Sequence, residues 1–341
     1  MVGRPSARSR RLRVLLLVHL DLMAPRRRRD VSASRLGWVK AEYDVMTTLA
    51  RSGHEVRQLG VAEELAPIRE AVADWKPDVV FNLVEEFQGE ALYDQNVVSY
   101  LELLRARYTG CNPRGMVLAR DKALAKQLAA ARGVRVPAWF AVRRGRRPRR
   151  PAELGFPLIV KSLLEEGSMG IAKASLVRDE TQLARRVAFV HESVGTDALV
   201  EEFIEGRELY VGVLGNERLR ALPPLELVVG ARGRAPLIAT QKLKHDLAYQ
   251  RRHRVRLRAP VLRAPLAREL VRTARTVFRA LQLSGYARID FRLDREGRLF
   301  FLEANPNPDI ARGEEMQLAA RRAGISYPAL LQRIVGLALA R

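Results

Sequence analysis

The sequence predicts a mixed α/β protein, with an N-terminal open parallel sheet followed by two further lobes of helices and strands. Three observations lead to this prediction. The first hundred residues alternate buried-strand patterns with amphipathic helix patterns. The later strand patterns occur in pairs joined by short turns or loops. A chain of 341 residues is also too long for one small core and favours two or three compact subdomains.

The N-terminal domain is expected to span residues 11–111. Its first strand is the apolar run LRVLLLV, which is typical of a parallel strand buried on both faces. Strand and helix patterns then alternate along the domain, and the expected order is strand 12–18, helix 38–52, strand 54–61, helix 68–75, strand 79–84, helix 95–105 and strand 107–110. This order indicates an α/β open sheet.

The second region is expected to span residues 112–198 and the third 199–341. In the second we expect helix 121–132, strands 157–163 and 171–177, and helix 181–192. Its basic loop at 143–151 is interpreted as a solvated surface turn. In the third we expect strands 198–206 and 208–216, a looser basic segment 242–258, helix 265–283, a hairpin over 286–305, and helices 314–323 and 327–340.

Composition excludes several classes of protein. Hydrophobic residues make up 48% of the chain, which argues against wholesale disorder. The single cysteine, Cys111, rules out an intramolecular disulfide and a Cys-rich zinc site. No apolar run reaches the roughly 18 residues that a membrane helix needs.

The net charge of +22 first suggests a nucleic-acid partner. Only eight of the 60 basic residues are Lys, however, and the 52 Arg residues are spread from end to end. That distribution indicates a compositional background of Arg, and 6% aromatic residues are too few for an obvious base-stacking platform. We therefore expect no nucleic-acid partner, and an Arg-driven nucleic-acid binder is the least favoured hypothesis.

The basic N-terminus raises the question of an export signal. Residues 9–13 precede the apolar run Val14 to Val18, a pattern that could be read as a twin-arginine signal. The run is short, His19 and Asp21 interrupt it, and no small-residue cleavage site follows. We expect a disordered basic arm over residues 1–10 and a cytoplasmic protein that neither spans nor binds a membrane.

The hairpin over residues 286–305 holds the most informative chemistry. If Leu293 pairs with Arg298 around the turn, residues at spacing two share a face. One face then gathers the polar residues Arg288, Asp290, Glu303 and Asn305 together with Phe301. The other face is wholly apolar and should lie on the core, and its residues are Ala287, Ile289, Phe291, Phe300, Leu302 and Ala304.

The polar face of this hairpin fits a hard cation. Carboxylates of Asp290 and Glu303 and the amide of Asn305 are the oxygen ligands that Mg²⁺ prefers. Arg288 beside them could hold a phosphate or a developing oxyanion. The alternative is an exposed polar face with an ordinary Arg–carboxylate pair.

Lysines and a glycine-containing loop suggest a phosphate site. The loop EEGSMG, with Ser168 and Gly170, lets the backbone approach a phosphate closely. Lys161 ends the apolar strand before it, where an unpaired ammonium is costly to bury. Lys122 opens a helix and Lys244 lies in the basic segment, so surface roles remain open for both.

The strand ALVEEFIEGRE fits an adenosine site. Val200 and Phe203 could flank a purine, backbone groups of residues 202–204 could bind its edge, and Glu201 and Glu208 could accept from the amino group and the ribose hydroxyls. An ordinary half-buried strand is the alternative.

Four segments together resemble the ATP-grasp superfamily, and within it the D-alanine–D-alanine ligase-like branch. They are YTGCNPRGMVLARDKALAKQ, FPLIVKSLLEEGSMGIAKAS, LVEEFIEGRELYVGVLGN and GYARIDFRLDREGRLFFLEANPNP. They occur in the family's order and cover most of residues 108–310. The resemblance implies an ATP-grasp fold, with two α+β lobes that enclose an ATP cleft.

The resemblance also assigns roles to individual residues. It implies ATP-binding roles for Lys122, Lys161, Ser168, Gly170, Glu201, Glu202, Phe203, Ile204 and Glu208. Asp290, Glu303 and Asn305 match ligands of Mg²⁺ or Mn²⁺, with two ions expected. Arg288 matches the arginine that steadies the tetrahedral intermediate, and Lys244 a further lysine at the γ-phosphate.

Three positions depart from D-alanine ligases. Residues 19–23 replace a Gly-rich motif after the first strand, Ser168 stands without a second adjacent serine, and Asp309 replaces a glycine. These positions bear on the amino-acid substrate more than on ATP. The segment 81–86 lies where a substrate loop is expected, with Asn82, Glu85 and Glu86 as candidates; a capped loop is an equal alternative.

The expected function is an ATP-dependent carboxylate–amine ligase that works through an acylphosphate and releases ADP and phosphate. Its partners would be a small carboxylate and a small amine, both unidentified. The oligomeric state stays open, with a homodimer as one option. The alternative is a non-catalytic ATP-binding or regulatory module on the same fold.

Overall fold

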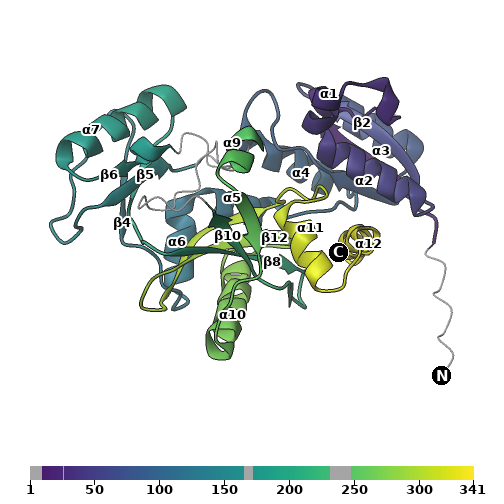
Figure 1. The fold of residues 1–341 in the computed structure, drawn as a ribbon. Coiled ribbons are helices and arrows are strands. Elements are labelled where there is room, and N and C mark those ends of the chain that lie inside the picture. Colours follow the sequence, from purple (N-terminus) through teal and green to yellow (C-terminus); the bar gives the residue numbers. More distant parts are fainter. Residues whose placement is uncertain (1–9, 26, 165–171, 231–246) are drawn as a thin grey trace. The chain divides into compact units, whose positions relative to one another are not determined.

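The computed structural model describes residues 10–25, 27–164, 172–230 and 247–341 of the chain (Figure 1). The chain divides into two compact units. Unit 1 comprises Met1–Gly110, Ile310–Gly313 and Ile325–Arg341, and unit 2 comprises Cys111–Asp309 and Glu314–Gly324. The chain therefore begins in unit 1 and enters unit 2 at Cys111. It then visits unit 1 briefly at Ile310–Gly313, goes back to unit 2, and ends in unit 1.

Unit 1 contains a parallel three-stranded sheet in the order β2-β1-β3. The strands are β1 (Arg13–His19), β2 (Glu55–Val61) and β3 (Val79–Asn82). The central strand β1 is buried from Val14 to Val18, which accounts for its continuous apolar run. The parallel sheet predicted for this part of the chain is thus confirmed.

Unit 1 also contains helices, several of which contact its sheet. They are α1 (Ala33–Trp38), α2 (Lys40–Arg51), α3 (Ala66–Trp75), α4 (Asp94–Leu103) and the C-terminal α12 (Tyr327–Leu339), with short 3₁₀ turns at Leu20–Leu22, Arg28–Asp30 and Ala91–Tyr93. The helix predicted over 38–52 is confirmed as α2, which begins at Lys40, and the short helix α1 before it was not predicted. The strand predicted over 107–110 is only a single bridge between Tyr108 and Val80.

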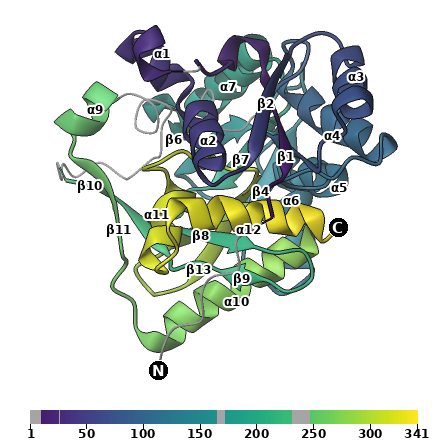
Figure 2. The same ribbon diagram turned by 90° about the vertical axis from the view of Figure 1, so that its right-hand side faces the viewer.

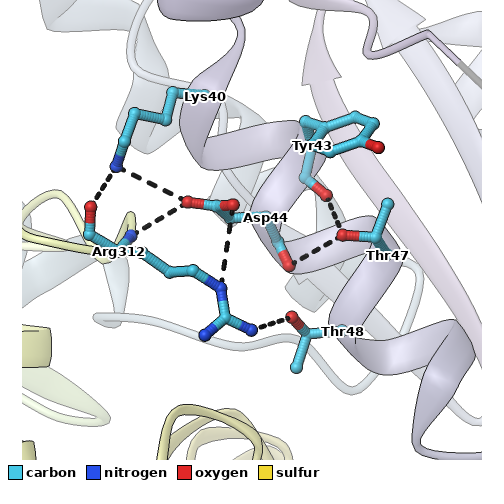
Figure 3. Close-up of polar contacts among 6 residues, drawn as sticks. All are labelled: Lys40, Tyr43, Asp44, Thr47, Thr48 and Arg312. Carbon is cyan, nitrogen blue, oxygen red and sulfur yellow. Dashed lines mark hydrogen bonds and ion pairs between the residues drawn. The ribbon is translucent and has the colours of Figure 1, made fainter. Parts of the chain in front are cut away.

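The segment Ile310–Gly313 is held to α2 by Arg312 (Figure 3). The backbone N–H of Arg312 donates to Asp44 Oδ2 at 3.0 Å, and Lys40 Nζ donates to the Arg312 carbonyl. The guanidinium donates to Thr48 Oγ1 at 3.1 Å and lies 4.2 Å from the ring centre of Tyr327 on α12. Backbone and side chain of Arg312 are both anchored, which fixes this short segment within unit 1.

Unit 2 contains two antiparallel sheets, and the smaller has the order β4-β7-β5-β6. Its strands are β4 (Trp139–Val142), β5 (Leu158–Ser162), β6 (Leu176–Val177) and β7 (Ala198–Glu202). The strand predicted over 171–177 is mostly wrong: Lys173–Ser175 forms a 3₁₀ turn, and only two residues pair with β5. Helix α7 (Glu180–Phe189), continued by a π turn at Val190–Val194, packs against this sheet.

The larger sheet of unit 2 runs β11-β10-β8-β12-β13, with β9 paired to β8. Its strands are β8 (Arg207–Leu214), β9 (Arg220–Ala221), β10 (Leu225–Val229), β11 (Val255–Arg258), β12 (Tyr286–Leu293) and β13 (Leu299–Pro306). The amphipathic helix α10 (Ala264–Ala280) lies along it (Figure 2) and contacts β8, β12 and β13. Among the described residues, the other helices of unit 2 are α5 (Pro113–Arg120), α6 (Lys122–Ala130), α9 (Leu247–Arg252) and α11 (Glu315–Arg322).

The register predicted for the β12–β13 hairpin is wrong by one residue. Leu293 pairs with Leu299 instead of Arg298, and a β-bulge lets Asp290 face Glu303 directly. Phe301 therefore lies opposite Phe291 on the apolar side. The bulge is stabilised from outside the hairpin: Phe301 N donates to Arg135 O at 2.9 Å, and Leu302 O accepts from Lys126 Nζ at 2.6 Å.

Phe300 was also assigned to the wrong face, because it pairs with Arg292 on the polar side of the hairpin. Arginines 135 and 298 lie over its ring at 5.6 and 5.9 Å from the ring centre.

Two further features bear on the class of protein. Cys111 is a buried free thiol. In the part of the chain that the structure describes, no helix combines the length and the apolar character that crossing a bilayer requires.

Candidate functional site

The larger sheet of unit 2 collects polar side chains on one face of three neighbouring strands. Arg288 of β12 pairs with Gly212 of β8 and Asn305 of β13, and Asp290 pairs with Tyr210 and Glu303. Since directly paired residues of antiparallel strands point to the same side, these side chains share a face. The structure thus brings Arg288, Asp290, Glu303 and Asn305 together, as the sequence predicted.

Arg288 forms the centre of this polar face. Its Nε and Nη2 donate to Oδ1 and Oδ2 of Asp290 at 2.8 and 2.9 Å, which makes the contact bidentate. Its Nη1 reaches Glu315 Oε2 at 3.3 Å, and its guanidinium lies 5.0 Å from the ring centre of Tyr210. Asn305 Nδ2 also donates to Asp290 Oδ2, at 3.2 Å.

The acidic neighbours strengthen the charge of Arg288. Burial opposes the guanidinium charge, but Asp290 and Glu315 outweigh it and raise the pKa of Arg288 well above its ordinary value. Burial and the nearby carboxylates of Glu208 and Asp290 also raise the pKa of Tyr210 well above its ordinary value. At neutral pH the site therefore holds a fixed cation and a neutral phenol.

Glu208 lies one step along the same face of β8. Its Oε1 accepts from Tyr210 Oη at 2.7 Å, and its Oε2 pairs with Arg292 Nη2 at 3.0 Å. Both oxygens of the carboxylate predicted to contact ribose are therefore already engaged by protein groups. A ribose hydroxyl would have to join this network.

A second cluster consists of two lysines around one glutamate. Glu201 of β7 pairs through Oε1 with Lys126 Nζ at 2.9 Å and through Oε2 with Lys161 Nζ at 2.8 Å. All three side chains are buried, and that of Lys126 is fully enclosed. Lys126 also lies 5.7 Å from the ring centre of Phe301. Glu201 therefore contacts lysines in this structure, where the resemblance implied a contact to adenosine.

The charges in this lysine cluster support one another unequally. Burial opposes ionisation of Glu201, but the two lysines outweigh it and lower the pKa of this carboxyl. Burial also opposes the charged form of Lys161, and Glu201 and Glu303 outweigh it and raise the pKa of Lys161. For Lys126 burial dominates and lowers its pKa. Since Glu303 acts on both lysines, the cluster and the polar face of the hairpin form one electrostatic neighbourhood.

The polar face offers the donor atoms that a hard cation requires. Two carboxylates on adjacent strands, joined by the amide of Asn305, supply oxygen ligands of the kind Mg²⁺ binds. Within the described ranges, no three His, Cys, Asp or Glu side chains gather in a way that could hold a metal. A cation on Asp290 and Glu303 would thus need oxygens from water or from a bound phosphate to complete its coordination.

The other predicted nucleotide contacts lie on or near β7. Phe203 and Ile204 follow the end of β7, and Ile204 is buried. The backbone N–H groups of Glu202 and Phe203 already donate to Ala138 O and Pro157 O, so they are not open to a purine. The side chain of Glu202 is exposed. Lys122 opens α6 and is buried.

Three predicted site residues, Ser168, Gly170 and Lys244, lie outside the described residues. Asn82, Glu85 and Glu86 belong to unit 1, at the end of β3 and in the loop that follows. Asn82 Oδ1 accepts from Val84 N at 3.2 Å, and Asn82 N donates to Thr109 Oγ1. Glu86 Oε1 lies 3.5 Å from Nε2 of His19 at the end of β1. This geometry includes the capped loop that the sequence left open as an alternative.

Three residues of the site were not predicted from the sequence, namely Lys126, Arg292 and Glu315. Lys126 follows Lys122 by four residues, so the two lie on one side of α6. That spacing, in a chain with only eight lysines, was the available signal. Arg292 continues the alternation of Arg288 and Asp290 along β12, so its place on the polar face was also foreseeable.

Sequence comparison places the chain in a known family. The family described as "D-ala D-ala ligase C-terminus" matches residues 128–336. The chain belongs to the D-alanine–D-alanine ligase family of ATP-grasp proteins. The resemblance inferred from the four segments is thereby confirmed.

Individual relatives of this ATP-grasp chain differ in what is known of them. An uncharacterized protein, y4sG of Sinorhizobium fredii, is 37% identical over 260 residues, covering 76% of this chain and 74% of its own. A D-alanine–D-alanine ligase of Geobacter sulfurreducens is 31% identical over 295 residues, covering 85% and 86%.

A solved D-alanine–D-alanine ligase of Bacillus anthracis, in complex with ATP, has a similar fold. Its TM-score is 0.73 at 20% identity, and the match covers 96% of this chain and 98% of that one. The ATP-grasp fold is therefore shown. At this level of identity the likeness to the solved ligase concerns the fold alone.

Proposed function

We propose that this protein is an ATP-dependent carboxylate–amine ligase that forms an acylphosphate and releases ADP and phosphate. The observation that carries the proposal is the placement of Asp290 and Glu303 opposite each other on one sheet face, with Arg288 bound to Asp290 and with Glu303 acting on two buried lysines. Phosphoryl transfer of this kind needs charge neutralisation and positioning more than covalent chemistry from the protein.

Residues of the hairpin would hold the metal. Asp290, Glu303 and Asn305 supply oxygen atoms, and we propose Mg²⁺ or Mn²⁺ as the ion, with two ions expected. When bound, such an ion neutralises negative charge on the transferred phosphoryl group. We extend the proposal to Ser168, Gly170 and Lys244, which fall outside the described residues, on the family resemblance alone.

The lysines would orient the phosphates of ATP. Lys161, whose pKa is raised by Glu201 and Glu303, stays an ammonium at neutral pH and can pair with a phosphate oxygen. We propose that Lys122 serves the same end, and that Glu202, Phe203, Ile204 and Glu208 surround the adenosine. The carbonyl of Glu202 remains as the acceptor there, since its N–H is used within the protein.

Arg288 would act after the phosphoryl transfer. Attack of an amine on the acylphosphate creates a tetrahedral intermediate with a negatively charged oxygen. Three of the five N–H groups of a guanidinium are engaged by Asp290 and Glu315. Among the described residues the other two have no hydrogen-bond acceptor, and we propose that they stabilise this oxygen. Asn82, Glu85 and Glu86 stay candidates for the amino-acid substrate.

The proposal is tested by product analysis with a matched variant pair. The protein is incubated with ATP, Mg²⁺ and pools of amino acids and dipeptides, and ADP, phosphate and new amide products are measured. We expect turnover with at least one pool, and loss of at least a hundredfold in Asp290→Asn. Glu296→Gln, in the exposed turn of the same hairpin, should leave turnover within about twofold. A thermal shift with Mg-ATP but no product from any pool would favour a non-catalytic ATP-binding module instead.

A further inference from the structure

Arg288 is shared between two carboxylates with different tasks. Asp290 takes the Nε and Nη2 donors with both of its oxygens, and Glu315 takes Nη1. Under the proposed function Asp290 must also bind a metal ion. An oxygen that coordinates a divalent cation is a poor acceptor for a nearby guanidinium, because the two positive charges repel each other. Binding of the ion therefore weakens the hold of Asp290 on Arg288.

Glu315 is placed to hold Arg288 when a metal ion occupies Asp290. It lies in the first turn of α11, a helix that contacts β8, the neighbour of β12 in the sheet. The Tyr210 ring of β8 also lies against the guanidinium. The side chains of Arg288 and Glu315 are only 11% and 19% exposed, so water screens their interaction weakly.

We propose that Glu315 is a positioning residue that keeps Arg288 on the polar face while Asp290 serves the metal ion. This inference rests on the proposed function, since it assumes a cation at Asp290 and Glu303. Without Glu315, Arg288 would keep only Asp290 as its ionic partner among the described residues. Arg288 would then compete with the ion for the same two oxygens.

The net charge of the polar face gives Glu315 a second way to favour cation binding. The three carboxylates of Asp290, Glu303 and Glu315 and the one guanidinium of Arg288 leave two negative charges, which the first divalent ion to bind neutralises. Removing the charge of Glu315 would leave an ion-loaded face with one positive charge. Loss of Glu315 should therefore weaken cation binding both by releasing Arg288 onto Asp290 and by removing a negative charge.

The test measures Mn²⁺ affinity in the presence of ADP, by calorimetry and by the electron paramagnetic resonance of free Mn²⁺. Neither reading requires turnover or a known substrate. We expect Glu315→Gln to weaken Mn²⁺ binding about fivefold, and Glu315→Asp to recover part of the loss. Glu314→Gln removes the same charge one residue earlier, at a position outside the contacts of Arg288, and should change the affinity less than twofold.

A double-mutant cycle separates a contact from general charge. In an Arg288→Met background, and in an Arg288→Gln background should the first not fold, the effect of Glu315→Gln should fall below twofold, because no cation remains at position 288. An unchanged fivefold effect in these backgrounds, or an equal effect of Glu314→Gln, would overturn the positioning role. Failure of the unaltered protein to bind Mn²⁺ with ADP would instead count against the proposed function itself.

Once a substrate pair is known, the same variants give a kinetic reading. Glu315→Gln should lower kcat at saturating Mn²⁺, because Arg288 is no longer held for the tetrahedral intermediate. The KM for ATP should stay within about twofold, since no ATP contact is removed. A rise in KM for ATP at unchanged kcat would show that Glu315 acts on nucleotide binding and would refute the role proposed for it.

Discussion

The substitution Glu201→Gln provides a quantitative test of the buried lysine cluster. Glu201 is 1% exposed and lies 2.9 and 2.8 Å from the ammonium groups of Lys126 and Lys161. Gln has almost the same size but no charge, so the substitution leaves two buried ammonium groups without their counter-ion. Lys126 is affected most, because it has no exposed surface at all.

The loss of unfolding free energy caused by Glu201→Gln can be estimated, and deprotonation of Lys126 sets its upper limit. Removing one partner of a buried ion pair typically costs about 3–5 kcal/mol. Lys126 can limit the cost by losing its proton, since burial already lowers its pKa. Deprotonating a lysine of ordinary pKa 10.5 at pH 7 costs about 5 kcal/mol, at about 1.4 kcal/mol for each pH unit. We therefore expect a loss of about 3–5 kcal/mol in the unfolding free energy of unit 2 at pH 7.

The pH dependence of this loss follows from the proton count. Burial already lowers the pKa of Lys126, and without Glu201 nothing at that position opposes it, so we expect Lys126 to be neutral in the folded variant at pH 7, whereas in the unfolded chain it stays charged up to its ordinary pKa of 10.5. The unfolded state then binds one more proton, so the stability of the variant rises by about 1.4 kcal/mol per pH unit. In the unaltered protein Glu201 favours the charged form of Lys126, so this slope is weaker. The destabilisation should consequently shrink as the pH rises from 7 to 9.

A tryptophan beside the cluster reports on unit 2. The chain has three Trp residues, and Trp139 is the one in unit 2, directly opposite Glu201 in the β4–β7 pairing. Replacing Trp38 and Trp75 by Phe makes fluorescence specific for this site. Urea unfolding at pH 7, 8 and 9 then gives the free energy of unfolding for each variant.

Lys126→Met supplies the control. Alone it leaves the Glu201–Lys161 pair intact and should cost clearly less than Glu201→Gln. Combined with Glu201→Gln, it removes the titrating group, so the double variant should be more stable than Glu201→Gln at pH 7 and should lack the pH slope. A loss that does not change with pH, or a double variant no more stable than the single one, would refute this account of the cluster.

Three further expectations follow from local geometry. Gly206→Ala should destabilise unit 2 by about 1–3 kcal/mol, because the new Cβ would lie 2.0 Å from the carbonyl oxygen of Leu293. Gly155→Ala, where the new Cβ meets open space, should be almost neutral in the same urea titration. Asp44→Ala should cost unit 1 about 1–2 kcal/mol through the lost contacts to Arg312 and Lys40, read from the fluorescence of Trp38 and Trp75 in a Trp139→Phe background. Glu55→Ala, which breaks only surface ion pairs, should cost less than about 0.5 kcal/mol. Cys111 should not react with a thiol reagent in the folded protein and should give one equivalent in denaturant, and rapid reaction of the native protein would contradict its burial.

The sequence predicted the larger elements and the residue types of the site because both depend on local pattern. The apolar run of β1 and the alternation in β12 are visible in a few consecutive residues. Arg288, Asp290, Glu303 and Asn305 were placed on one face although the assumed register was wrong. The register differs from the predicted one by one residue at the turn and by a second residue beyond the β-bulge. The two shifts together leave the faces as predicted, so Asp290 lies opposite Glu303 and Arg288 opposite Asn305.

The bulge and the lysine cluster could not be read from local pattern. Alternation carries no mark of the bulge at Leu302, since its carbonyl is satisfied by Lys126, 176 residues away. In the sequence, Lys126 likewise resembles an ordinary lysine on a helix surface. Only the fold shows that Glu201 of β7 lies beside it. Both features depend on contacts between distant segments, which only the folded chain specifies.

The scarcity of lysine acquires a physical meaning in this site. Six of the eight lysines are described, and three of these, Lys122, Lys126 and Lys161, are buried. Burying a cation is costly unless an anion or several acceptors receive it, so chance placement is a poor explanation. A compact ammonium can approach a carboxylate, a carbonyl and a ring at once, as Lys126 does with Glu201, Leu302 and Phe301. A planar guanidinium would need a wider gap between these groups. The buried lysines therefore mark places where a small cationic group fits among packed elements, and the net charge of +22 of the whole chain gives no comparable information on function.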